Sequence, residues 1–274
     1  MATVTGALGF EERWQDRLSG TPRAHAIDRW IFVFMAGWFI AIVLAGFIPS
    51  SLEKIAAVQA GTRAPFPLVM HMHALLMGTF LLLLLAQTTL VATGRCALHR
   101  RLGLAAMVIA PAIVIVGFVL VPTNYYALWN AAQAAPEGVR AQLEQTVRFI
   151  ENIMLLQLQV GILFPLLLVI GLRARGSDPG LHKRMMILAT AVALPAGIDR
   201  IPWLPTTMPA SPLASDLYTL LAIAPMFLWD AFRNRGIHPA YWIWLAWWLP
   251  VSIAVNALWG TEVWHAAARM LMGV

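Results

Sequence analysis

Three of the seven histidines lie next to long apolar stretches, where a neutral imidazole could serve as a metal ligand. His73 opens an apolar run that continues as Ala-Leu-Leu-Met. His99 follows the same run within Leu-His-Arg-Arg-Leu-Gly, and His182 lies in Leu-His-Lys-Arg-Met. Because few other side chains in these stretches can react or bind ions, we expect any redox or metal chemistry to depend on these rings.

The spacing of these residues predicts a weak internal repeat. His73 precedes His99 by 26 residues, and Gln157 precedes His182 by 25. Each segment is an apolar run, a turn with Gly and Arg, and then Leu-His followed by two basic residues. Two copied helical hairpins would form a pseudo-repeated four-helix core, although the low identity also allows coincidence. A helix of 26 residues is roughly 39 Å long, so one metal could not bind both His73 and His99.

His99 and His182 form the first candidate site. Each is expected just after a turn, at the start of a helix, where the helix dipole favours a neutral ring. Two such helices packed together would bring the rings close enough to bind one haem iron or to flank a quinone. The alternative is that each histidine caps its helix, or lies among lipid headgroups beside the neighbouring Arg and Lys residues.

A second candidate site lies at the opposite ends of the helices. His71 and His73 are candidate metal ligands, and Met77, four residues after His73, could add a soft ligand for Cu(I). Charged groups inside a membrane tend to face a cavity or one another. The sequence therefore predicts a catalytic pocket formed by His73 with Glu151, Asp199 and Arg200. The alternative is a polar rim at the membrane surface, where His238 and His265 are also expected.

The composition predicts an all-α polytopic membrane protein. Hydrophobic residues make up 60% of the 274 residues and charged residues only 12%. Seven apolar runs match helices that cross a bilayer, because only helices satisfy the backbone over such long continuous stretches. They cover residues 30–48, 67–92, 102–121, 149–172, 185–199, 213–229 and 240–259. Prolines within five of these runs predict kinks: Pro111, Pro165, Pro195, Pro225 and Pro250.

We expect a single transmembrane domain, 1–274, with short segments at both ends. Residues 1–29 carry Phe10, Trp14 and Leu18 four apart among charged residues, which predicts a short amphipathic helix at the membrane interface. A solvated tail is the alternative. Residues 261–274 form a short C-terminal segment.

The positions of the basic residues predict the orientation. With the N-terminus in the cytoplasm, thirteen of the nineteen Lys and Arg residues lie on the inner side, as the positive-inside rule requires. We therefore expect the inner membrane of a bacterium. The net charge of +6 follows from this membrane pattern, so nucleic acid is not an expected partner.

Several function classes are excluded. The single cysteine, Cys96, cannot form an internal disulfide or an iron–sulfur cluster. The chain has no nucleotide-binding loop, no His-Glu-x-x-His zinc motif and no convincing serine nucleophile. The last predicted helix has no buried lysine for a retinal-type pigment.

The segment from His73 through the His-Arg-Arg-Leu-Gly motif to the His-Lys-Arg-Met motif resembles the cytochrome b561 group. It also resembles bacterial membrane proteins of unknown function that carry His-Arg-x-x-Gly. The similarity covers about residues 70–200. It implies a four-helix core that holds b-type haem, with His73, His99 and His182 as candidate ligands. The sequence departs from this pattern at Gln157, which stands where a partner histidine for His73 would be expected.

The leading functional hypothesis is an integral membrane redox protein that uses haem b or a quinone for electron transfer. One alternative is an accessory or assembly subunit that binds other membrane subunits. Another is a transporter or non-haem metal enzyme that uses the pocket around His73, Glu151, Asp199 and Arg200.

Overall fold

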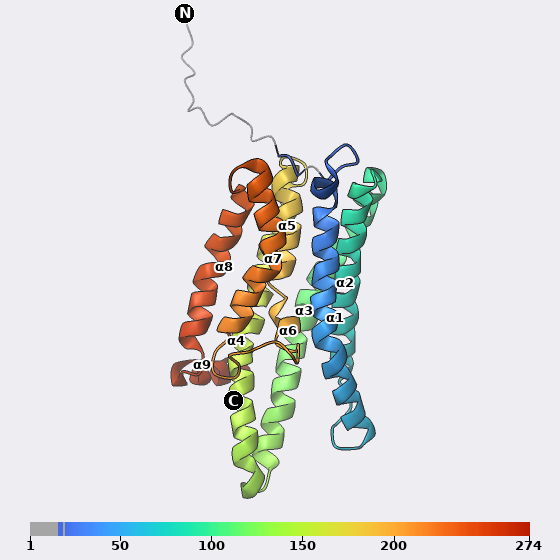
Figure 1. Ribbon diagram of the computed structural model, residues 1–274. Helices are drawn as coiled ribbons and strands as arrows, with labels where there is room; N and C mark the ends of the chain where they lie inside the picture. The colour runs from blue at the N-terminus through green and yellow to red at the C-terminus, as the bar shows by residue number, and fades with distance from the viewer. Residues whose placement is uncertain (1–15, 19) are drawn as a thin grey trace, which may run out of the picture.

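The computed structural model describes residues 16–18 and 20–274, and its regular structure is entirely helical. The helices are α1 (Ala26–Gln59), α2 (Leu68–Ala92), α3 (Cys96–Ala134), α4 (Glu137–Ala174), α5 (Pro179–Ala191), α6 (Pro195–Ile198), α7 (Leu213–Asn234), α8 (Pro239–Leu258) and α9 (Glu262–Met272). The prediction of an all-α fold is confirmed. Successive long helices run in opposite directions along one axis, with α5 and α6 together forming one leg of this path (Figure 1).

Within the described part of the chain, five helices are long and apolar enough to cross a membrane: α1, α2, α3, α4 and α8. Their apolar windows are only 17–44% buried within the protein, so most of that hydrocarbon surface faces outward. Apolar surface on this scale requires a lipid environment, as in an integral membrane protein.

The predicted run 185–199 is not one helix. α5 ends at Ala191, and the chain makes tight turns before α6 begins at Pro195. Proline has no N–H and therefore ends the α-helical hydrogen-bond pattern here. The other four prolines with predicted kinks lie inside continuous helices, Pro111 in α3, Pro165 in α4, Pro225 in α7 and Pro250 in α8.

The break in this run coincides with a close contact between two glycines. Gly46 of α1 lies so near the backbone oxygen of Gly197 that a Cβ at residue 46 would be 1.9 Å from it. A side chain at either position would separate the two backbones. The sequence therefore brings α1 and α6 into direct backbone contact.

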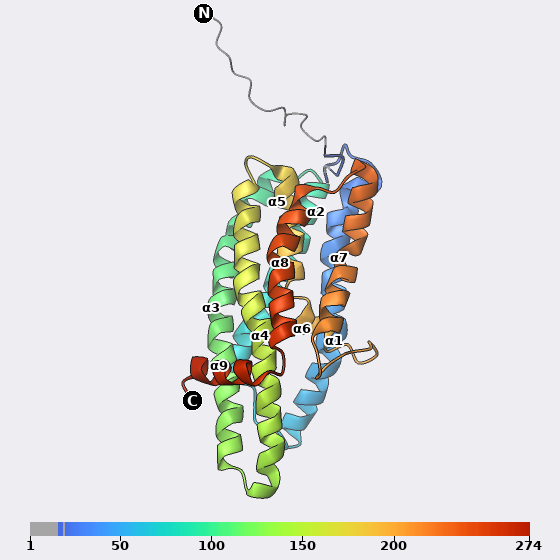
Figure 2. The ribbon, with the colours of Figure 1, turned by 90° about the vertical axis from the view of Figure 1, so that its left-hand side faces the viewer.

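The main hydrophobic core is centred on α5. Met185, Ile187, Leu188 and Ala189 are fully buried there, and they pack with side chains of α1, α4, α7 and α8. α2 lies at one edge of the bundle in Figure 1, and α3 lies at an edge in Figure 2. A second, smaller cluster joins α3, α4, α8 and α9 around Tyr125, Met154 and Trp264.

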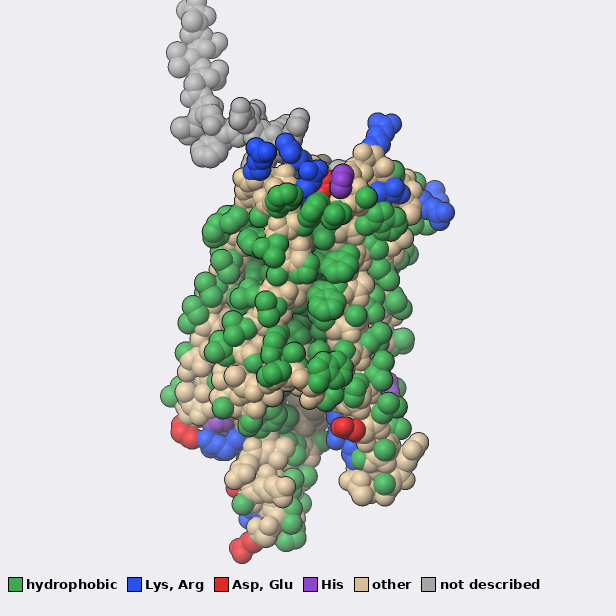
Figure 3. All heavy atoms as spheres, in the orientation of Figure 1, with side chains coloured by type: hydrophobic (Ala, Val, Ile, Leu, Met, Phe, Trp, Pro, Cys, Tyr) green, Lys and Arg blue, Asp and Glu red, His purple; other side chains and the backbone are tan. Residues whose placement is uncertain are grey.

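The predicted interfacial helix in residues 1–29 falls partly outside the described residues, because Phe10 and Trp14 lie in the segment 1–15. Of the rest, residues 16–18 and 20–25 form turns, and α1 already begins at Ala26. Leu18 is fully buried in the core, so it does not face lipid. Lys and Arg side chains gather at the end of the bundle where α1 begins (Figure 3).

Candidate histidine site at two helix junctions

His99 and His182 occupy equivalent positions in two helix junctions. Each is the fourth residue of its helix, since α3 begins at Cys96 and α5 at Pro179. The His99 N–H donates to the carbonyl of Arg95 at 3.1 Å, and the His182 N–H donates to the carbonyl of Asp178 at 3.0 Å. The backbones of His99 and His182 therefore occupy the same position in the first turn of their helices.

The two side chains also make the same hydrogen bond. Nδ1 of His99 lies 3.3 Å from the carbonyl oxygen of Gln87 in α2, and Nδ1 of His182 lies 2.8 Å from that of Gly171 in α4. A carbonyl can only accept, so each Nδ1 carries the proton. In the neutral ring the lone pair is then on Nε2, which is the arrangement that orients a histidine for metal binding.

The two rings meet between the hairpins. Their centroids are 6.5 Å apart, and the ring planes are inclined at 76°. Among the described residues, neither Nε2 atom has a hydrogen-bond partner, and neither is sealed from its surroundings. The junctions thus present two neutral imidazoles, each with one available lone pair.

This donor set fits a metal with two histidine ligands. A ring nitrogen binds a metal at about 2 Å, so two imidazoles on opposite sides of one ion have centroids about 6 Å apart. No group of three or more His, Cys, Asp or Glu side chains suited to a metal occurs in the part of the chain that the structure describes. Two nitrogen donors are fewer than the three or four protein ligands of a typical zinc site.

Positive charge surrounds the rings. Arg100 and Arg175 lie near enough to His99 and His182, respectively, to act on them electrostatically. Both arginines are exposed, as are the other arginines of the two junctions, Arg95, Arg101 and Arg173. Within the described chain, none of these five side chains forms an ion pair. The site is suited to a ligand that carries negative groups.

His71 and His73 do not join this pair. Gln87 lies 14 residues after His73 on α2, which is about 21 Å along the helix. His71 is exposed and lies edge-on to Phe66. His73 is half-buried beside Gly117 of α3, and its Nδ1 is buried without a hydrogen-bond partner.

Glu151 is engaged with α9. Its buried carboxylate accepts hydrogen bonds from Nδ1–H of His265 at 2.6 Å, from Nε of Arg269 at 2.9 Å and from the hydroxyl of Tyr125 at 3.2 Å. The sequence predicted only an interfacial position for His265. The i, i+4 spacing of His265 and Arg269 in a mostly apolar helix is the signal that both contact one acidic partner.

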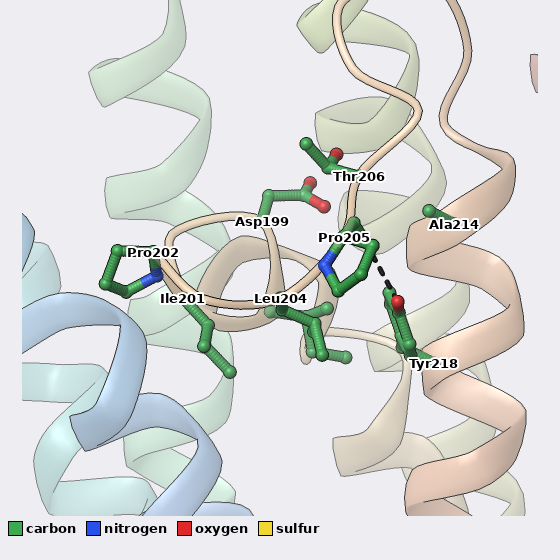
Figure 4. Close-up of a pocket in the computed structure, with 9 residues that line it drawn as sticks. Asp199, Ile201, Pro202, Leu204, Pro205, Thr206, Ala214 and Tyr218 are labelled. Atoms are coloured by element: carbon green, nitrogen blue, oxygen red, sulfur yellow. Dashed lines mark hydrogen bonds between the residues drawn. The ribbon is translucent and has the colours of Figure 1, made fainter.

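Asp199 and Arg200 lie elsewhere, after α6. Asp199 accepts a hydrogen bond from the Ser215 hydroxyl of α7, and Arg200 donates to the carbonyl of Ala196. Asp199 lines a cavity of about 180 Å³ with Thr206, Ala214 and Tyr218 (Figure 4). Among the described residues no hydrogen bond or ion pair links any two of the four predicted pocket side chains, namely His73, Glu151, Asp199 and Arg200.

A buried charge network that the sequence did not predict begins two residues after His182, at Arg184. Arg184 donates to Asp230 of α7 at 2.5 and 2.8 Å and to Asp16 at 2.8 and 3.0 Å. Tyr241 of α8 also donates to Asp230, at 2.9 Å. The signal was Asp230, an acid near the end of an apolar run, which needs a buried basic partner.

Comparison with known protein families, with curated proteins and with solved structures gave no match for this chain.

Proposed function

We propose that the chain is an integral membrane redox protein that crosses the bilayer seven times. The long apolar helices α1, α2, α3 and α4 form the first four crossings, and α8 forms the last. Between them, α5 together with α6 forms the fifth crossing and α7 the sixth. α5 is too short to cross alone, but residues 179–198 together have the length of a spanning helix. The alternating helix directions support this count (Figure 1).

The basic end of the bundle faces the cytoplasm in this proposal. Arg95 and Arg175 lie in the two short connections at that end, and Arg100, Arg101 and Arg173 lie in the adjoining helix turns, as the positive-inside rule expects. The start of α1 lies at the same end, so the N-terminal side is cytoplasmic (Figure 3). The membrane is the inner membrane of a bacterium.

His99 and His182 would hold the iron of haem b. The observation that carries this proposal is the matched pair of junctions, where each ring is fixed by a backbone carbonyl and has a free Nε2. Bound haem would supply one-electron redox chemistry. The protein would fix the ring tautomers, position the ligand between the two hairpins, and offset its negative groups with arginine.

The resemblance of residues 70–200 to the cytochrome b561 group supports the same reading, on the His99 and His182 motifs alone. His73 would not be a ligand of this group, because it lies about 21 Å along α2 from the Gln87 carbonyl. A quinone bound between the two rings is the related possibility for the same donor set.

The test is the absorption spectrum and iron content of the protein purified in detergent, with His99→Ala and His182→Ala as variants. We expect a reduced Soret band in the wild type and its loss in both variants. His71→Ala is the matched control, because that ring is exposed near the opposite end of α2 and lies edge-on to Phe66, and its spectrum should equal the wild type.

A colourless wild-type protein that binds neither added haemin nor a quinone would reject the redox proposal. If that protein then co-purified with a fixed set of membrane subunits, the accessory-subunit alternative would replace it.

A further inference from the structure

The orientation of α9 differs from that of every long helix. It runs across the bundle axis, over α4 and α3, at the end remote from His99 and His182 (Figures 1 and 2). A helix of 11 residues is about 16 Å long, which is too short to cross a bilayer. The environment of α9 therefore differs from that of the helices that cross the bilayer.

One residue of α4 fixes this crossing. Besides the carboxylate bonds to His265 and Arg269, the backbone oxygen of Glu151 accepts from Nε1 of Trp264 at 2.7 Å. Three residues of α9 thus bind one residue of α4. The contact sets both the position and the rotation of α9 about its own axis.

This rotation leaves an apolar face outward. Trp264, His265 and Ala268 are buried against the bundle, whereas Val263 is 74% exposed and Met270 77% exposed. Ala266 is exposed as well and shares the face of Val263 and Met270, because the three positions follow an i, i+3, i+7 spacing. A helix with one face docked and the other face apolar requires a second apolar environment.

Aromatic and charged side chains gather at the same level. The guanidinium carbon of Arg269 lies over the ring of Trp129 of α3, 5.7 Å from the centroid of that ring. The hydroxyl of Tyr126 donates to the carbonyl of Met272. Arg148 of α4 pairs with Glu262 at the start of α9. Tyr and Trp next to ion pairs are typical of the boundary between lipid and water.

The length of α4 gives the distance between the two boundaries. Glu151 contacts α9, and the Gly171 carbonyl contacts His182. These residues are 20 apart in one helix, or about 30 Å, which is the thickness of the hydrocarbon core of a bilayer. The α9 level and the histidine junctions therefore match the two faces of one membrane.

We propose that α9 lies in the membrane interface opposite the histidine junctions, with Val263, Ala266 and Met270 inserted among the lipids. The α3–α4 hairpin beyond Glu151 then projects into water. This inference rests on the membrane embedding proposed above and is independent of haem.

The experiment uses spin labels on the full-length protein in lipid nanodiscs, with Cys96→Ser as the background. Labels at Val263 and Met270 report on α9, a label at Val108 on the lipid-facing side of α3, and a label at Arg140 on the hairpin. We expect the first two to be accessible to oxygen and protected from a water-soluble nickel complex, at a shallower depth than residue 108. The label at residue 140 should be open to the nickel complex.

Each other outcome is decisive. If residues 263 and 270 are as open to nickel as residue 140 while residue 108 remains in lipid, α9 is in water and the inference is wrong. If residue 108 is also open to nickel, the membrane embedding itself is wrong. If residues 263 and 270 are closed to both reagents, and dipolar coupling joins two copies, a second chain covers the face instead of lipid.

Discussion

Arg184 of α5 and Asp230 of α7 form a two-point ion pair whose side chains are both closed to solvent. Tyr241 and Asn234 complete the coordination of the carboxylate, and Asp16 completes that of the guanidinium. The network therefore joins α5, α7, α8 and the segment before α1 at one end of the bundle. Breaking such a pair is costly because it leaves a buried charge without its partner.

Asp230→Asn should lower the free energy of unfolding by up to about 3–5 kcal/mol, since Arg184 would lose its fully buried counter-charge and keep only the partly exposed Asp16. Thermal unfolding in detergent checks this. Asp178→Asn is the matched control, because Asp178 is an exposed N-cap of α5 and Asn caps a helix equally well. Equal melting temperatures for the two variants would contradict the stabilising role of the pair.

Gly46→Ala should destabilise the protein strongly, because the new Cβ would overlap the backbone oxygen of Gly197. We expect a loss of about 1–3 kcal/mol from overpacking, or more if α6 cannot move. Gly37→Ala is the control in the same helix. Its Cβ would meet no atom within 4 Å, and the substitution should stabilise α1 by up to about 1 kcal/mol. Melting temperatures that shift in the same direction would show that the glycine contact is not tight.

The stability of the protein should fall in acid through Asp16. Burial alone would raise the pKa of this carboxyl, but hydrogen bonds and charge from Arg184, and then from Lys183, lower it below its usual value of 3.8. A lowered folded-state pKa adds stability above pH 3.8, and that stability is lost as the pH falls toward the folded-state value.

Asp16→Asn should therefore be less stable than the wild type at pH 7, and the difference should shrink below about pH 4. Melting temperatures from pH 7 to pH 3 at constant ionic strength measure it. Curves that stay parallel over this range would show that Asp16 does not sense the charge of Arg184.

Glu151→Ala should release α9, because Arg269 and His265 would lose their shared acceptor. We expect a loss of about 2–3 kcal/mol, from hydrogen bonds to a charged group. Hydrogen exchange of residues 262–272 should rise at least tenfold. Glu144→Ala is the control, since Glu144 is an exposed acid on the same helix. Unchanged exchange in Glu151→Ala would mean that packing of Trp264 alone holds α9.

The sequence predicted the helical class and the histidine junctions because both depend on local patterns. Leu-His followed by two basic residues after a Gly/Arg turn located His99 and His182 at the starts of helices, and the structure brings these rings within contact distance. Both motifs are short-range features, so they can be read from neighbouring residues.

The predicted pocket of His73, Glu151, Asp199 and Arg200 shows what could not be read in this way. Depth in the membrane follows from position along a helix, but rotation about the helix axis depends on packing. Glu151 faces α9, and Asp199 faces Ser215 across the break between α5 and α6. The sequence predicted a kink at Pro195 but neither a break between two helices nor the helix α9, so it could not identify the partners of these two acids.

The contact between the two histidine rings affects how far the two hairpins can move apart. The α2–α3 and α4–α5 hairpins are connected covalently by the turn at Ala135 and Pro136, at the opposite end of α3 and α4. An atom bound to both rings would link the α2–α3 turn to the α4–α5 turn. The two hairpins would then be joined at both of their ends. Binding of such an atom would slow the separation of α3 from α5, although the covalent chain would be unchanged.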